Sequence, residues 1–161
     1  MTRRITVSIL LCLLLAGCAG TPARFDSVSH IDDPVRNRLL LVYAEWAGTP
    51  YRFGGESRQG VDCSGFIQQV YWRLDGQQLP RTTAQQSGLG VSVAREHLQP
   101  ADLVFFKTGW KQRHAGIYLG GGEFMHASSQ RGVMISRLDN PYWQDAWWMA
   151  RRMPLAVKTD L

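Results

Sequence analysis

Apolar residues recur at helical spacing in two stretches of the first half of the chain. The first begins at Asp32-Asp33-Pro34, where an aspartate caps the free N–H groups of the first turn and proline suits the first helical position. The pattern continues to residue 46, and Gly48 with Pro50 ends the helix. We therefore expect an amphipathic helix whose apolar face packs on the core and consists of Val35, Leu39, Val42, Tyr43 and Trp46.

The second helix is predicted to begin beside a cysteine. Asp62 is a good N-cap for a helix ending near Asp75-Gly76, because apolar residues recur at helical spacing through that range. Cys63 then lies in the first turn, where unpaired backbone N–H groups and the positive end of the helix dipole favour thiolate over thiol. This position predicts an activated nucleophile, and a buried structural cysteine is the alternative interpretation.

The second half of the chain is predicted to form a sheet. A short helix capped by Thr82 or Thr83 should run to about Ser87, and strands should follow after Gly88. Asn140-Pro141-Tyr142 predicts a turn or a short helix. Helices first and strands afterwards predict an α+β fold, with N-terminal helices packed on a C-terminal antiparallel sheet. Its strands are expected near residues 103–106, 114–119, 123–127, 133–135 and 147–152.

Two histidines lie on the arms of the hairpin that the glycines at 120–122 predict. A two-residue turn would send His114 and His126 to opposite faces of the sheet. A three-residue loop, or a bulge with the same effect, would place them on one face as a diagonal pair with Cα atoms ~7 Å apart. We predict the three-residue loop or its equivalent bulge, and we expect His30 and His97 to be exposed.

The N-terminus has the pattern of a secretory signal. Arg3 and Arg4 precede an apolar run at residues 5–16, which is shorter than the ~20 residues of a membrane span. The run ends in Leu15-Ala16-Gly17-Cys18, which resembles the lipobox of bacterial lipoproteins and implies lipidation of Cys18. An ordinary signal peptide is the alternative. Lipidation implies an anchored protein facing the periplasm, and Ala19 after the lipidated residue favours the outer membrane.

These features divide the chain into four parts. We expect a signal peptide at residues 1–17, a lipidated flexible tether at 18–31, a catalytic domain at 32–153 and a tail at 154–161. Removal of the signal takes away two arginines and lowers the net charge from +5 to about +3. That charge, without a basic run and in an exported protein, gives no indication of a nucleic-acid partner.

Cysteine usage also separates Cys63 from the other cysteines. Cys12 leaves with the predicted signal and Cys18 carries lipid, so Cys63 has no partner for a disulfide. Exported proteins usually use cysteine in pairs, because their compartment is oxidising. An unpaired thiol that is kept there suggests a chemical use.

Several motifs together resemble the NlpC family of bacterial cell-wall cysteine endopeptidases, which have a papain-like fold. The resemblance runs from about Val35 to Met153. One departure is Ala101, where the family usually has glycine before the aspartate of the strand, and it affects only the local turn. The motifs are Tyr51-Arg52-Phe53-Gly54-Gly55, Gly60-Val61-Asp62-Cys63-Ser64-Gly65-Phe66, Leu79-Pro80-Arg81-Thr82, Asp102-Leu103-Val104-Phe105-Phe106, His114-Ala115-Gly116-Ile117-Tyr118 and His126-Ala127-Ser128.

The resemblance implies a catalytic triad. Cys63 would be the nucleophile and His114 the general base, while His126 would hold the His114 imidazole in its working tautomer and orientation. A cysteine paired with histidine can exist as thiolate and imidazolium, and the imidazolium protonates the leaving amine. The backbone N–H of Cys63, at the helix start, is the natural donor to the oxyanion.

Four further residues are implied near the substrate. Tyr51 would lie near the thiol, where its hydroxyl assists the oxyanion or binds substrate. The side chains that would grip the charged stem peptide are Asp62, Ser64 and Arg81. Helix capping by the first two, and a surface ion pair for the arginine, are the structural alternatives.

The implied substrates are stem peptides of peptidoglycan, and no cofactor is expected. The bond is either the one between D-γ-glutamyl and a diamino acid or the D-alanyl to diaminopimelate cross-link. Three other readings stay open. They are an amidase or acyltransferase on the same fold, a wall-binding lipoprotein without turnover, and a zinc site formed by Cys63, His114 and His126, which lacks paired-cysteine spacing.

Overall fold

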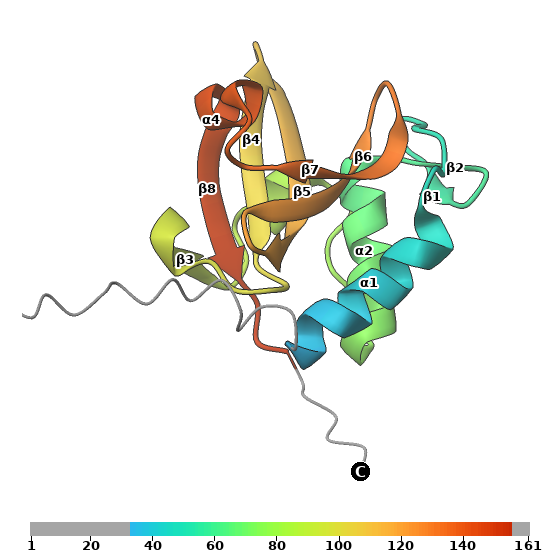
Figure 1. Cartoon of the computed structure of the whole chain (residues 1–161). Helices are drawn as coiled ribbons and strands as arrows, with labels where there is room; N and C mark the ends of the chain where they lie inside the picture. The colour runs from blue at the N-terminus through green and yellow to red at the C-terminus, as the bar shows by residue number, and fades with distance from the viewer. Residues whose placement is uncertain (1–32, 156–161) are drawn as a thin grey trace, which may run out of the picture.

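The computed structural model describes residues 33–155 (Figure 1). The predicted signal peptide, the tether and Cys18 lie outside the described residues, as does most of the predicted tail. Among residues 33–155, no helix has the length and apolar character that a membrane crossing requires.

The predicted helices form with the predicted caps. Helix α1 (Pro34–Trp46) begins at Asp33, whose carboxylate accepts the N–H groups of Val35 and Arg36. Helix α2 (Cys63–Asp75) begins at Asp62 and ends at Gly76, whose φ of 77° suits glycine. Helix α3 (Thr83–Gln86) begins with a capping box at Thr82. The loop expected between α1 and α2 instead contains a small hairpin of β1 (Glu56–Ser57) and β2 (Gly60–Val61).

The second half of the chain forms one six-stranded antiparallel sheet, which confirms the α+β prediction. The spatial order is β3-β8-β4-β5-β6-β7. A short helix, α4 (Pro141–Ala146), and a 3-10 turn, η1 (Arg95–His97), connect the strands. The strands are β3 (Val91–Val93), β4 (Leu103–Gly109), β5 (Gln112–Gly120), β6 (Glu123–Ser128), β7 (Gly132–Arg137) and β8 (Trp147–Arg152).

The core lies on both faces of this sheet, which explains the unbroken apolar run at the start of β4. Leu103 and Phe105 belong to the cluster that contains the apolar faces of α1 and α2. Val104 and Phe106 alternate with them and belong to the cluster beneath α4. All four side chains are fully buried, and each contributes about 1.5–3 kcal/mol by leaving water. Helix α2 packs across β5 and β6, so the start of this helix meets the middle of the sheet (Figure 1).

The glycine hairpin has the predicted face but not the predicted loop. Gly120 pairs with Glu123 across a two-residue turn at 121–122, so the three-residue loop is wrong. A bulge between Tyr118 and Gly120 then shifts the register, and Ile117 pairs with Met125. The extra residue returns both histidines to one face, as the predicted bulge requires. Both central glycines have positive φ, which a turn of this length demands.

Candidate active site

The Cys63 thiol lies at the start of α2 and faces β5. Only 7% of the residue is exposed, and its sulfur lies 3.5 Å from the Thr83 hydroxyl oxygen of α3. The backbone N–H of Ala115, in the middle of β5, also points to the sulfur. Within the described part of the chain Cys63 is the free cysteine, as expected.

The electrostatics of this thiol differ from the expectation. Burial raises the pKa of Cys63 above its ordinary value, and the negative charge of Asp62 acts in the same direction. The Thr83 hydroxyl and the backbone N–H groups near the sulfur lower the pKa, but they do not offset the burial. Cys63 is therefore a neutral thiol at neutral pH, and the helix start alone does not make it a thiolate.

The two predicted histidines meet on the sheet. His114 Nε2 lies 2.8 Å from His126 Nδ1, so the rings share a hydrogen bond across β5 and β6. His126 is 2% exposed, and Trp143 of α4 stacks on His114 with centroids 5.5 Å apart. Burial lowers the pKa of His114 to about 4 and that of His126 to about 3. Both rings are therefore neutral near pH 7, and each has one donor and one acceptor nitrogen.

Ser136 of β7 completes this arrangement, and sequence reasoning missed it. Its hydroxyl oxygen lies 2.9 Å from His126 Nε2. If Nε2 donates to Ser136, Nδ1 of His126 is an acceptor and receives the N–H of His114 Nε2. Nδ1 of His114 then carries the free lone pair, as a general base requires. The β6–β7 register could have identified Ser136, because His126 pairs with Met134 and therefore lies diagonal to Ser136.

The thiol and the histidine pair approach each other through adjacent residues of β5. Ala115, whose N–H faces the sulfur, directly follows His114. Among residues 33–155 no hydrogen bond joins Cys63 Sγ to the His114 ring, because the sulfur contacts Thr83 instead. The structure thus brings His114 and His126 into contact and places Cys63 beside the same strand.

The three polar residues predicted near the thiol form one network. The Arg81 guanidinium binds both oxygens of the Asp62 carboxylate, at 2.9 and 2.7 Å, and lies 3.0 Å from the Ser64 hydroxyl. Asp62 also accepts the N–H groups of Gly65 and Gly54. Although burial opposes ionisation, these bonds hold the pKa of Asp62 below its usual range. Asp62 and Arg81 thus have the structural roles that were the alternatives to substrate binding. Asp62 caps α2, and Arg81 forms an ion pair with Asp62.

Tyr51 lies in the same cavity as the thiol. This cavity of about 340 Å³ is lined by Tyr51, Cys63, Arg81 and Arg113, among others, and we call it the thiol cavity. Burial raises the pKa of Tyr51, and the nearby Cys63 and Asp62 raise it further. Its hydroxyl therefore stays protonated near neutral pH and can donate a hydrogen bond.

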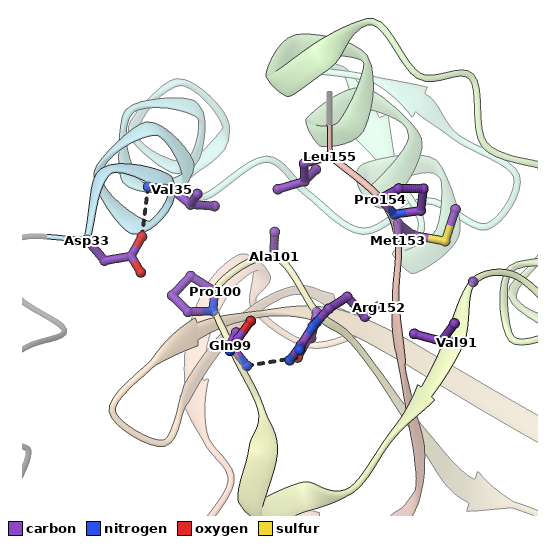
Figure 2. A pocket seen from close by; sticks show the side chains of 12 residues that line it. Asp33, Val35, Val91, Gln99, Pro100, Ala101, Arg152, Met153, Pro154 and Leu155 are labelled. Atoms are coloured by element: carbon purple, nitrogen blue, oxygen red, sulfur yellow. Dashed lines mark hydrogen bonds and ion pairs between the residues drawn. The ribbon is translucent and has the colours of Figure 1, made fainter. Parts of the chain in front are cut away.

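Two other cavities lie outside the thiol cavity. One of about 480 Å³ is lined by His114 and His126 and shares no residue with it. Another, of about 900 Å³, lies between the start of α1 and the end of β8. Figure 2 shows Val35 on one side of it and Met153, Pro154 and Leu155 on the other. It contains neither the cysteine nor the histidines, so we do not assign the chemistry to it.

The zinc interpretation has no support in this geometry. Across the described residues, no group of three or more His, Cys, Asp or Glu side chains is placed to hold a metal ion. The thiol contacts a hydroxyl, and the two histidine rings are hydrogen-bonded to each other.

Comparisons with known proteins agree with the sequence motifs. Residues 48–152 match the model of the NlpC/P60 family. The chain is 44% identical to the probable endopeptidase NlpC of Escherichia coli over 153 residues, which cover 93% of this chain and 99% of that protein. It is also 44% identical to the E. coli murein DD-endopeptidase MepS/murein LD-carboxypeptidase over 126 residues, 78% of this chain and 66% of that longer protein.

A solved structure supports the fold. An NLP/P60-family protein described as similar to lipoprotein, from Staphylococcus aureus, superposes with a TM-score of 0.67 at 36% identity, covering 75% of this chain and 42% of that one. The papain-like α+β architecture is therefore common to this chain and a family member of known structure.

Proposed function

The chain belongs to the NlpC/P60 family, and from that membership we propose that it is a cysteine endopeptidase that hydrolyses amide bonds in peptidoglycan stem peptides. The observation that carries the proposal is the histidine pair. The pair holds the His114 imidazole neutral and oriented. The next residue, Ala115, points its backbone N–H at the free Cys63 thiol.

We propose that acylation begins from neutral groups. Cys63 Sγ turns from Thr83 and attacks the amide carbonyl carbon, while its proton passes to Nδ1 of His114. The carbonyl oxygen becomes an oxyanion that the backbone N–H of Cys63 and the protonated Tyr51 hydroxyl stabilise. When the C–N bond breaks, His114 returns the proton to the leaving amine. A thioester on Cys63 remains.

Deacylation reverses these roles. A water molecule attacks the thioester carbon and gives one proton to His114, and the C–S bond breaks as the carboxylic product forms. His114 then returns the proton to the sulfur. His126 holds the ring of His114 through both steps, and the Asp62–Arg81 pair supplies charged groups beside the acyl part of the substrate.

The bond that is cut is part of the proposal. A relative with 44% identity is named a murein DD-endopeptidase, which favours the D-alanyl to diaminopimelate cross-link for this chain. Another relative, 40% identical over 111 residues, is named a gamma-DL-glutamyl hydrolase, and this name favours the γ-glutamyl bond. We expect the cross-link to be cut, because the former match covers more of both proteins.

Digestion of purified muropeptides by the full chain tests this function. Mass analysis should show cross-linked dimers converted to monomers, whereas γ-glutamyl cleavage would release shortened stems and an amidase would release whole stems. Cys63→Ala and His114→Ala should each abolish conversion while the variants keep the wild-type circular dichroism. Binding of muropeptides without any conversion would instead support a wall-binding protein.

We also propose that Cys18 carries the lipid that anchors the protein to a membrane facing the periplasm. The support is the lipobox at residues 15–18. Labelling of cells with an alkyne fatty acid should mark the protein, and Cys18→Ala should remove the label. Wild-type protein that is recovered in the soluble fraction of lysed cells, and not with the membranes, would contradict the anchor.

A further inference from the structure

The cavity that contains the histidine pair shares no lining residue with the thiol cavity. We call it the amine-side cavity. The end of β4, the start of β5, the β6–β7 turn and helix α4 surround it. In Figure 1, helix α4 lies at the top of the view, away from the start of α1. The residues that carry the argument are His114, Gln112, Ser128, Arg131, Asn140 and Tyr142.

The direction of amide hydrolysis assigns a role to each cavity, provided that the proposed function holds. The acyl half of the substrate becomes attached to Cys63 and must occupy the thiol cavity. The general acid must reach the leaving nitrogen to protonate it. Since His114 lines the amine-side cavity, the residue that carries the leaving amine has its place there.

The charges that line the amine-side cavity indicate which chemical group the leaving residue of the substrate carries. Its lining has no aspartate or glutamate, and both histidines are neutral near pH 7. Arg131 is therefore its one charged side chain. The guanidinium makes no ion pair with any described residue, although six of the other arginines in this part of the chain do. An exposed, unpaired guanidinium beside neutral polar groups is suited to a carboxylate.

The backbone at Arg131 is held in place. The Ser128 hydroxyl oxygen accepts the N–H groups of Gln130 and Arg131, both at 3.3 Å. Gly132 follows with a φ of 72°, and a Cβ atom there would lie 2.2 Å from the Thr49 carbonyl oxygen. The turn is thus packed against the loop after α1, and the exposed Arg131 side chain extends from this fixed backbone.

We propose that the amine-side cavity binds the leaving residue and that Arg131 binds a free carboxylate on the carbon that carries the released amine. This chemistry distinguishes the two stem-peptide bonds. In the D-alanyl cross-link, the carbon that bears the released amine of the diamino acid also bears a free carboxylate. In the γ-glutamyl bond, the corresponding carboxyl group is already part of the next peptide bond. Arg131 therefore makes the enzyme selective for the cross-link.

A matched pair of peptides tests the role of Arg131. Both carry a D-alanyl amide of a D-amino acid, which ends in a free carboxylate in one peptide and in a carboxamide in the other. The wild-type chain should hydrolyse the carboxylate peptide with a kcat/KM about 10-fold higher, mainly through KM, as expected for one charge-assisted contact. Arg131→Gln should bring the ratio close to one, and Arg131→Glu should invert it. Arg58→Gln, which removes an exposed arginine outside both cavities, should keep the wild-type ratio.

Product binding separates this inference from the proposed function. The amine product with its free carboxylate should shift NMR signals of the β6–β7 turn in Cys63→Ala, and the added Arg131→Gln change should weaken binding about 10-fold. Arginine-dependent binding without hydrolysis by the wild type would support the cavity and overturn the peptidase function. Hydrolysis with equal kcat/KM for the two peptides would overturn the role of Arg131 alone.

Discussion

Mild acid should destabilise this protein through its buried histidine pair. In the fold, the pKa of His114 is lowered to about 4 and that of His126 to about 3, whereas a histidine in an unfolded chain titrates near ~6.5. Below that pH the unfolded chain binds protons that the folded protein does not, so the free energy of unfolding decreases. The contribution of the neutral pair is fully present above pH ~6.5 and is lost as the pH falls toward the folded-state values.

The expected magnitude follows from the size of these shifts. Each proton that only the unfolded chain binds lowers the free energy of unfolding by about 1.4 kcal/mol per pH unit. Two neutral histidines approach about 3 kcal/mol per unit once the unfolded rings are protonated, and the loss between pH ~6.5 and ~5 reaches about 3 kcal/mol, because the unfolded rings are only half protonated at the upper limit. That is a large part of the ~5–15 kcal/mol stability of a typical domain. Unfolded carboxyl groups titrate near ~4, below this window, so the two effects can be separated.

Urea unfolding at a series of pH values, followed by tryptophan fluorescence, measures this slope. The double variant His114→Gln/His126→Gln should lose the pH dependence between about 7 and 5, and His97→Gln, at an exposed position, controls for the loss of a histidine as such. If the double variant does not fold, NMR of the wild-type imidazole protons gives the same answer. Unfolding free energies that stay constant from pH 7 to 5 would contradict this prediction. Ring signals of His114 and His126 that titrate near 6.5 would contradict it as well.

Three further predictions concern single positions. Gly116→Ala should cost about 1–3 kcal/mol of stability and most of the activity. The new Cβ would lie 2.8 Å from the Met125 carbonyl oxygen and 3.2 Å from the His126 Cβ. Urea unfolding and muropeptide digestion measure the two losses. Ala101→Gly should stabilise the fold by about 0.5–1 kcal/mol, since alanine stands there at a φ of 76°, and a lower midpoint of thermal unfolding would contradict this. Iodoacetamide should modify Cys63 in the substrate-free enzyme more slowly than a free thiol at pH 7.5, because its pKa is raised; faster modification would show that the resting thiol is ionised.

The local chemistry of the chain predicted most of the fold. Asp33, Asp62 and Thr82 cap the three N-terminal helices as expected, because capping depends on residues within one turn. Five strands of the main sheet also fall where apolar runs and turns placed them, whereas β3 and the β1–β2 hairpin were not among the predicted strands. The bulge at Leu119 could be posed only as an alternative, since the glycine triplet permits several turns and the choice depends on contacts across the whole sheet.

The residues predicted for the site lie near one another in the structure, but their protonation states were not predictable from the sequence. The sequence indicated Cys63, His114 and His126 as the reacting groups, and the structure places all three beside β5. It did not reveal Ser136, which required the β6–β7 register, or the raised pKa of the thiol. A helix start is visible locally, whereas the depth at which that start is buried depends on tertiary packing. For Cys63 the burial outweighs the helix start.

The neutral, secluded sulfur has a consequence for the durability of the enzyme. Peroxide and disulfides react with thiolates, and they react far more slowly with a protonated thiol that is closed off from solvent. In the mechanism proposed above the nucleophile gives up its proton only as it attacks, so a cysteine of this kind would resist oxidation if the protein is exported as proposed. The burial of Cys63 and its contact with Thr83 are the features that support this protection.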